Sequence, residues 1–284
     1  MKIDKVRHLY RDSYNIIRCP ICHENVQLHE PASFVCNRGH CFDLSGWGYV
    51  NLMQNSRKTF YDKPLFESRR TIFSNGYFVP LAREITRVLG GIVKNGDANA
   101  KLVDVGCGEG YYPAYIQHEY PFWDIYALDT AKEAIIMGAK QYFGIKWIIG
   151  NLANLPFKDS CMDIVMEVFA PANYTEFKRI IKDDGYILKV IPGEGYLKEL
   201  RESICFKSAE KSYSNRRVIE YFSQNLRLCD IKKICYNKPV TDDIKKHFLK
   251  MSPLMFGKDE QMVDISHIDV FTFDFQILIG QKKL

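Results

Sequence analysis

Short apolar runs alternate with segments of helical periodicity through the central part of the chain. Runs that end in polar or glycine residues predict four strands, at 102–105, 124–129, 145–150 and 162–169. Apolar residues at helical spacing follow three of these runs, at 109–120, 131–143 and 173–182. Strands that alternate with helices in this way predict an open, mostly parallel α/β sheet.

The C-terminal part predicts the remaining strands of the same sheet. A fifth strand is expected at 186–191, after a turn at 184–185. The segments 229–236 and 269–279 alternate or run apolar, and we expect them to form an antiparallel pair that closes the sheet. A helix at 242–250 is expected between them.

The segment 57–77, ahead of this region, mixes basic with aromatic residues. Such a composition suits an RNA loop, because aromatic rings stack on bases and cations pair with phosphates. The same segment also fits an amphipathic helix that packs on the sheet with Leu65, Phe66, Ile72 and Phe73 inward. Both roles stay open.

The first 18 residues form a basic extension with two tyrosines between the cations. A basic arm for RNA and a solvated terminal helix are the two interpretations, and the helix is favoured. The net charge of the 284-residue chain is +5, which permits binding to a polyanion without requiring it. No apolar run is long enough for a membrane span, and the charged N-terminus lacks a secretory core, so we expect a cytoplasmic protein with no membrane partner.

A turn with glycines at alternate positions follows the first central strand, in the stretch Lys101–Gly110. Backbone can approach a ligand closely where Cβ atoms are missing, and the amide groups at the start of the next helix face such a ligand. A dinucleotide fingerprint would need its third glycine at Tyr111, which argues against NAD or FAD. The spacing D-x-G-x-G-x-G resembles instead the first motif of the S-adenosylmethionine-dependent methyltransferases.

Polar residues also stand at the ends of the next strands. Asp129 lies about 20 residues beyond the glycines, where a nucleoside-binding sheet presents a carboxylate to a ribose diol. In the methyltransferases that the motif resembles, the end of the third strand meets the adenine, and the matching residue here is Asn151. The alternative is an α/β domain whose strand-end residues merely form turns.

Four residues near the N-terminus have the spacing of a metal site. Cys19 and Cys22 form a C-x-x-C knuckle, and Cys36 and His40 form a C-x-x-x-H pair 13 residues later. A Cys₃His set is one that Zn²⁺ prefers in closed, structural sites. A redox C-x-x-C is the alternative, but no thioredoxin-like strand-to-helix turn is predicted around it. Cys41 stays open as a replacement for His40.

Beyond these pairs, the sequence carries Gly48–Leu52 (G-Y-V-N-L) and Gly106–Tyr112 (G-C-G-E-G-Y-Y). This combination, with the preceding C-P-x-C and C-x-x-x-H-x-F-D, resembles the bacterial 23S rRNA guanine-N1 methyltransferases. The similarity continues through 155–157, 170–171 and 192–193, and so covers nearly the whole chain after the first 18 residues.

The resemblance implies an α/β fold of class I S-adenosylmethionine-dependent methyltransferase type. It is Rossmann-like, with a mostly parallel seven-stranded sheet and an antiparallel terminal strand, and a small zinc ribbon precedes it. We therefore expect four segments: a basic extension at 1–18, a ribbon at 19–55, a linker with helices at 56–98, and the methyltransferase domain at 99–284.

The implied cofactors are S-adenosylmethionine and structural Zn²⁺. The residues expected to bind S-adenosylmethionine lie at strand ends and in the linker: Arg69, Asp104, Gly106, Gly108, Gly110, Tyr111, Tyr112, Asp129, Asn151 and Leu152. The expected metal ligands are Cys19, Cys22, Cys36 and His40. Two local departures from the family pattern occur, at 61–63 in the linker and at Tyr196, where the family has histidine.

The implied reaction transfers a methyl group to N1 of a guanine in a 23S rRNA stem-loop. Guanine N1 must lose its proton, and Glu167 is a weak candidate for the base, beside Ala170 and Pro171, which would line the target-base cleft. The alternatives are a methyltransferase of another RNA or of a small molecule, and a non-catalytic RNA-binding protein. The implied partner is 23S rRNA, and a homodimer stays open.

Overall fold

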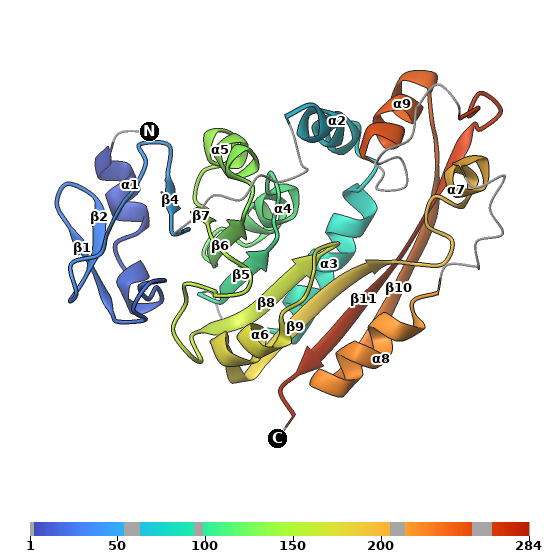
Figure 1. Ribbon diagram of the computed structural model, residues 1–284. Coiled ribbons are helices and arrows are strands. Elements are labelled where there is room, and N and C mark those ends of the chain that lie inside the picture. Colours follow the sequence, from blue (N-terminus) through green and yellow to red (C-terminus); the bar gives the residue numbers. More distant parts are fainter. Residues whose placement is uncertain (1–2, 54–62, 94–98, 205–213, 252–262, 284) are drawn as a thin grey trace.

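The computed structural model describes residues 3–53, 63–93, 99–204, 214–251 and 263–283, and its centre is an eight-stranded sheet (Figure 1). In spatial order the strands are β10 (Arg227–Pro239), β11 (Val270–Gln281), β9 (Ile181–Pro192), β8 (Met162–Val168), β5 (Lys101–Val105), β6 (Asp124–Asp129), β7 (Lys146–Ile149) and β4 (Tyr49–Asn51). The strands from β9 to β4 pair in parallel, whereas β11 is antiparallel to both of its neighbours.

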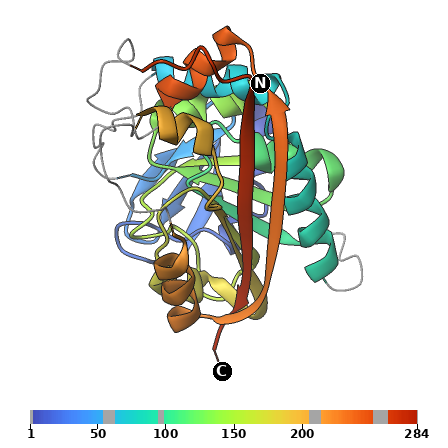
Figure 2. The same ribbon diagram turned by 90° about the vertical axis from the view of Figure 1, so that its right-hand side faces the viewer.

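The predicted mostly parallel sheet with an antiparallel terminal strand is confirmed, and β4 adds an eighth strand at one edge. The long β10–β11 pair runs along the opposite edge (Figure 2). The turn expected at 184–185 lies within β9, where the pairing with β8 jumps from Ile181 to Tyr186.

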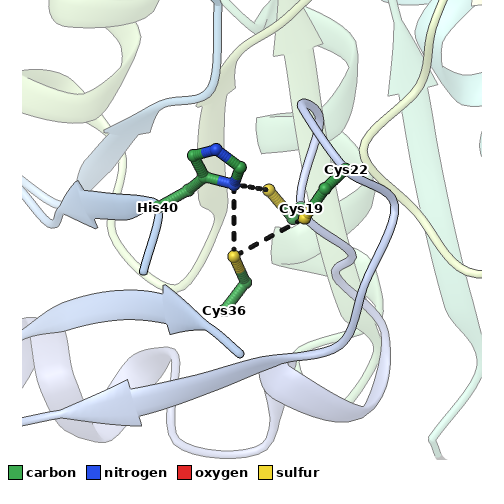
Figure 3. Close-up of side chains that lie close together, drawn as sticks. All are labelled: Cys19, Cys22, Cys36 and His40. Carbon is green, nitrogen blue, oxygen red and sulfur yellow. Dashed lines mark hydrogen bonds between the residues drawn. The ribbon is translucent and has the colours of Figure 1, made fainter. Parts of the chain in front are cut away.

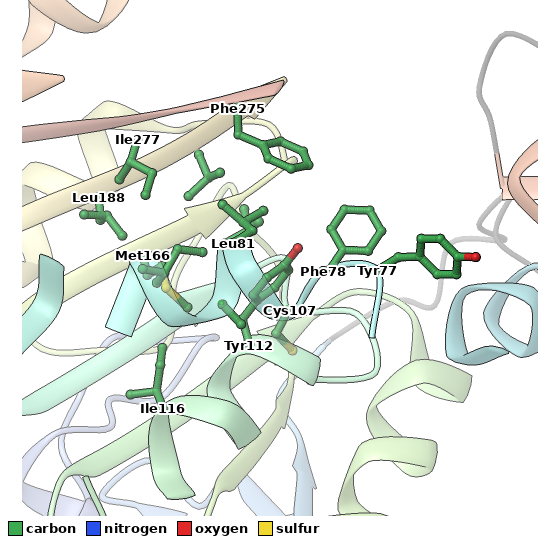
Figure 4. Close-up of a cluster of buried hydrophobic side chains, with 14 of the residues drawn as sticks. Tyr77, Phe78, Leu81, Cys107, Tyr112, Ile116, Met166, Leu188, Phe275 and Ile277 are labelled. Atoms are coloured by element: carbon green, nitrogen blue, oxygen red, sulfur yellow. The ribbon is translucent and has the colours of Figure 1, made fainter. Parts of the chain in front are cut away.

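Helices cover both faces of the sheet because successive side chains of a buried strand point to opposite faces. Leu102 of β5 belongs to one core, which is filled by residues of α3 (Val79–Ile92), α4 (Tyr111–Glu119), α5 (Lys132–Gln141) and α9 (Asp242–Met251). Figure 4 shows part of this core, where Leu81, Tyr112, Met166 and Phe275 gather. Val103 and Val105 point into the other core, with α6 (Tyr174–Ile180) and α8 (Arg216–Asn225).

The chain before the first central strand supplies α2 (Lys63–Ser74), and α7 (Lys198–Ile204) follows β9. In α2 the side chains of Leu65, Phe66 and Ile72 are buried, as expected, whereas Phe73 is half-buried. Leu65 and Phe66 pack against Ala131 and Ala134 at the start of α5 and not on the sheet as expected. The departure from the family pattern at 61–62 lies outside the described residues.

The N-terminal segment packs on the sheet as a structural layer. It contains α1 (Ile3–Leu9), the short 3₁₀ helix η1 (Ser13–Asn15), and a three-stranded antiparallel sheet of β1 (Val26–His29), β2 (Ser33–Cys36) and β3 (Cys41–Asp43). The connection from β7 to β8 contains no helix, so the sheet face there needs another cover. Tyr10, which is fully buried, provides part of it by donating a hydrogen bond of 2.8 Å to the carbonyl of Trp147 in β7.

This packing joins segments that the sequence separates. The Tyr126 hydroxyl reaches Ser13 Oγ at 3.2 Å, Ile17 forms a bridge with Phe157, and β4 pairs in parallel with β7. The domain boundaries expected from the sequence stay a prediction, but the ribbon's last strand is part of the main sheet. Among the described residues, none of the helices combines the length and apolar character needed to cross a membrane.

Candidate active site and metal centre

The glycine turn lies at the carboxyl end of β5, and two of its glycines touch other parts of the fold. Gly106 has φ +81°, and a Cβ there would lie 2.5 Å from the Cβ of Ala170, which follows β8. Gly110 has φ +79°, and a Cβ there would overlap the ring of Trp147. Only glycine satisfies both the left-handed backbone and the close approach at these positions.

Gly106→Ala is expected to weaken S-adenosylmethionine binding by about tenfold or more, because the added methyl displaces the turn from Ala170. Isothermal titration would measure this. Gly91→Ala in α3 is the matched control, since a Cβ there meets nothing within 4 Å and alanine favours a helix. Equal affinities in the two variants would contradict the role given to Gly106.

Asp129, at the end of β6, holds the glycine turn. Its carboxylate accepts hydrogen bonds of 2.8 Å from the backbone N–H groups of Gly108 and Ala131. A carboxylate offers about four lone-pair sites, so the group keeps acceptors for two hydroxyls of a ribose. The arrangement therefore fixes the carboxylate beside the turn.

Several polar groups around the turn are buried without partners. Asp104 is 1% exposed, and neither of its oxygens has a hydrogen-bond partner among the described residues. Burial, together with the nearby carboxylates of Asp129 and Glu167, raises the pKa of Asp104 well above its usual value. The hydroxyl of Tyr112 is buried and unpartnered within the same described part of the chain. These groups fit a bound ligand that brings its own ammonium group and hydrogen-bond donors.

Arg69 of α2 reaches the same turn from the linker. Its guanidinium forms an ion pair of 3.3 Å with Glu109 and lies 3.3 Å from the position of a Cβ on Gly108. The pair holds α2 over the turn, where Phe73 stacks on Tyr111 with ring centroids 4.2 Å apart. The ring of Tyr111 is thus used in packing against α2.

Asn151 and Leu152 follow β7, two strands from the glycine turn. Leu152 approaches the turn, with its Cδ2 4.0 Å from the position of a Cβ on Gly106. Asn151 is exposed, and its Oδ1 accepts from the backbone of Ala153 at 2.9 Å. Both residues therefore lie at the carboxyl ends of the parallel strands, where the nucleoside is expected.

On the other side of β5, a buried ion pair lies under the end of β8. Glu167 is 1% exposed and pairs with Lys189 of β9, whose ammonium also donates to the carbonyl of Ala170 at 3.2 Å. Burial raises the pKa of Glu167 to about 7, against the lowering effect of Lys189. Sequence reasoning did not anticipate Lys189, because only the pairing of β8 with β9 brings it to Glu167.

The four candidate metal ligands gather in one cluster, with their ligand atoms all within 4.8 Å of one another (Figure 3). The Sγ atoms of Cys22 and Cys36 lie 3.6 Å apart, and Nδ1 of His40 is 3.3 Å from Cys36 Sγ and 3.5 Å from Cys19 Sγ. Edges of about 3.5–3.8 Å are those of a tetrahedron with Zn–S near 2.3 Å and Zn–N near 2.1 Å.

The surroundings of the cluster also suit Zn²⁺. Burial of Cys36 is outweighed by hydrogen bonds from the backbone of Arg38 and His40, and these hydrogen bonds lower the pKa of its thiol to about 6, whereas burial raises the pKa of the Cys19 thiol to about 11. A thiolate is the form that binds metal. Cys41 is exposed, and its thiol faces Asp43 at 3.8 Å, so it lies outside the cluster. The donor set fits a closed structural zinc site.

Comparisons with known proteins agree with this architecture. Residues 17–59 match the family model described as "RlmA, N-terminal", a zinc ribbon, and residues 102–185 match "Methyltransferase domain". The Bacillus subtilis protein named "Putative 23S rRNA (guanine-N(1)-)-methyltransferase YxjB" is 34% identical over 278 residues, covering 95% of this chain and 98% of YxjB.

The 23S rRNA (guanine(748)-N(1))-methyltransferase of Streptomyces fradiae is 28% identical over 192 residues, covering 66% of this chain and 67% of its own. Among solved structures, a protein from Anabaena variabilis titled "Putative methyltransferase from antibiotic biosynthesis pathway" is 14% identical, with a TM-score of 0.49, and the alignment covers 70% of this chain and 96% of that one. The fold is that of a class I S-adenosylmethionine-dependent methyltransferase with an N-terminal zinc ribbon. Because YxjB shares this identity over nearly the full length of both chains, this chain belongs to the 23S rRNA (guanine-N1)-methyltransferase family.

Proposed function

We propose that this protein transfers a methyl group from S-adenosylmethionine to N1 of a guanine in 23S rRNA. The observation that carries the proposal is a glycine turn close to Ala170, next to the buried carboxylate of Asp104, which has no hydrogen-bond partner among the residues that the structure describes. The names of the relatives, YxjB and the Streptomyces fradiae enzyme, give the substrate.

The proposed cofactor contacts follow the order of the strands. Asp129 accepts from the ribose hydroxyls, Asn151 and Leu152 border the adenine, and the glycine turn lies along the methionine part. Asp104 pairs with the ammonium group, and Arg69 is positioned for the carboxylate. When bound, S-adenosylmethionine supplies an electrophilic methyl group on its sulfonium. The protein aligns that group with the guanine in a site closed to water.

Ala170 and Pro171 border the target base in this proposal. Glu167 is 1% exposed, and one of its carboxylate oxygens is paired with Lys189. We therefore assign to Glu167 a positioning role, in which it fixes Lys189 and, through the Lys189 hydrogen bond, the carbonyl of Ala170.

Glu167→Gln keeps the shape of the carboxyl in the neutral form that its raised pKa favours in the folded protein, so at pH 6 its free energy of unfolding is expected to stay within about 1 kcal/mol of the wild type. The double variant Glu167→Met, Lys189→Met removes both charges and is expected to unfold near the wild-type urea midpoint. A urea midpoint of Glu167→Gln far below that of the wild type at pH 6 would show instead that folding stabilises the ionised pair with Lys189.

The same carboxyl gives a pH dependence. Its pKa of about 7 in the folded protein exceeds the value of about 4.3 in an unfolded chain. Between these values the folded protein keeps a proton that the unfolded chain has lost, so the contribution of Glu167 to stability declines as pH rises through this window. The free energy of unfolding of the wild type, relative to that of the double methionine variant, should therefore fall as pH rises through this window.

We propose that the rRNA also contacts the N-terminal segment. A groove of about 660 Å³ lies between α1 and β1, and its lining includes Asp4 as well as Arg7, His8, Arg11 and Tyr14. Arg7 and Arg11 form ion pairs with Glu30 and Asp12, which phosphates would have to replace. Cations that pair with phosphates and a ring that stacks on a base suit a single-stranded RNA segment. The basic side of α1 would serve RNA while Val6 and Tyr10 pack it on the sheet. Because the proposed substrate is rRNA, we also propose a cytoplasmic location, and the homodimer stays open.

Mapping of methylguanosine in 23S rRNA by mass spectrometry, from cells with and without the protein, tests the proposed function. We expect one guanine to lose its N1-methyl group in the absence of the protein. Tritiated S-adenosylmethionine with undermodified 23S rRNA and with tRNA then separates the substrates. Transfer to tRNA alone would contradict the substrate, and titration without any affinity for S-adenosylmethionine would indicate a non-catalytic RNA-binding protein.

A further inference from the structure

Phe169 combines backbone strain with an exposed aromatic ring at the end of β8. Its φ is +57°, and its side chain is 42% exposed. The other described residues besides glycine with positive φ are His23, Ser160 and Leu197, none of which exposes a large apolar side chain. A left-handed backbone is unfavourable for phenylalanine and persists only where the surrounding fold imposes it, often at functional sites.

The surroundings of Phe169 fix this conformation. Its backbone N–H donates to the carbonyl of Val190 at 3.1 Å, and the next residue, Ala170, is held by Lys189. Its ring lies near the ring of Tyr196, with centroids 6.4 Å apart and planes inclined by 22°, and 5.5 Å from the ring of Phe275. The ring therefore stands on a rigid aromatic base with part of its surface in solvent.

The position of Phe169 relative to the glycine turn indicates a function for its aromatic ring. Gly106 and Ala170 are in close approach, so Phe169 lies on the rim of the cofactor turn. In the sheet, β6 and β8 flank β5 on opposite sides. If Asp129 at the end of β6 holds the ribose, the end of β8 borders the reacting end of the cofactor.

From this placement, and resting on the proposed function, we propose that Phe169 is the stacking platform for the target guanine. A base inside an RNA loop must leave its stack to reach the methyl group, and an aromatic face replaces the stacking that it loses. The backbone at Phe169 is left-handed, and its ring keeps part of its surface in solvent. Tyr196 and Phe275 support it from behind.

The test compares Phe169→Leu, Phe169→Tyr and the wild type in single-turnover methylation of 23S rRNA with saturating tritiated S-adenosylmethionine. Leucine keeps an apolar side chain on the same backbone but has no aromatic face, whereas tyrosine keeps the face. We expect Phe169→Leu to slow methyl transfer by about 10- to 100-fold, the range for one lost base–aromatic stack, and Phe169→Tyr to stay within about threefold of the wild type.

Two further measurements separate stacking from a structural role. Affinity for S-adenosylmethionine and overall affinity for rRNA should stay within about threefold of the wild type in all variants, because phosphate contacts dominate RNA binding. Asparagine tolerates the left-handed backbone, so Phe169→Asn should remain folded by circular dichroism. It should slow methyl transfer by the same factor as Phe169→Leu. A wild-type rate in Phe169→Leu would overturn the proposal. No rRNA methylation by the wild type would instead overturn the proposed function.

Discussion

Asp129→Ala is expected to raise the dissociation constant for S-adenosylmethionine by about 100-fold or more. In the proposed complex Asp129 accepts two hydrogen bonds from ribose hydroxyls, each worth about 1.5–3 kcal/mol, and the variant loses both. The variant also frees the backbone N–H groups of Gly108 and Ala131, which the carboxylate holds at 2.8 Å. Loss of that restraint loosens the glycine turn, so both effects lower affinity.

Isothermal titration with S-adenosylmethionine measures the effect, and two variants control it. Asp129→Asn keeps the shape but only one of the two oxygen acceptors, so an intermediate affinity is expected. Asp183→Ala removes a carboxylate that is 89% exposed and pairs with Lys282, and it should leave the affinity unchanged. If Asp129→Ala binds as tightly as the wild type, the ribose is held elsewhere.

The second large effect is expected from loss of the metal cluster. The double variant Cys19→Ser, Cys22→Ser removes two of four ligands, and a structural zinc contributes on the order of 10 kcal/mol to the folding of such a small unit. We expect the three-stranded sheet of the ribbon to unfold. Rising hydrogen exchange in β1, β2 and β3 would report it.

The tertiary structure predicts that unfolding of the ribbon also weakens the cofactor site. Tyr10 donates to the carbonyl of Trp147, and the ring of Trp147 packs beneath Gly110 of the glycine turn. When the N-terminal segment detaches, β7 loses β4 as a neighbour, and the support of the turn weakens. We therefore expect faster hydrogen exchange at 101–110 and weaker binding of S-adenosylmethionine as well as of RNA.

Cys41→Ser is the matched control for the metal experiment, because its exposed thiol faces Asp43 outside the cluster. It should leave bound zinc, measured by atomic absorption, and both affinities unchanged. Unchanged affinity for S-adenosylmethionine in the double serine variant would show that the ribbon and the methyltransferase core are energetically independent.

Phe169 and Lys189 show why part of the candidate site escaped sequence reasoning. Each lies in an apolar run that reads as an ordinary strand, with no spacing that indicates a site. The left-handed φ of Phe169 and the pairing of Lys189 with Glu167 exist only after β8 and β9 align. No local pattern encodes either feature.

Short-range sequence patterns were enough to predict the main features of the candidate site. The glycine turn, Asp129 at a strand end and the four-residue metal set were found because one strand and its turn fix the relative positions of nearby residues. The alternation of apolar runs with segments of helical periodicity likewise predicted the mostly parallel sheet, which the structure confirms.

Only the tertiary structure decided how these parts are joined. It placed β4 on the edge of the main sheet, α1 and Tyr10 over the face left open between β7 and β8, and Arg69 above the glycine turn. Each of these contacts joins residues far apart in the chain. The free energy of these contacts comes from burial and hydrogen bonding that arise once the sheet exists, so the spacing of residues in the sequence does not predict the contacts.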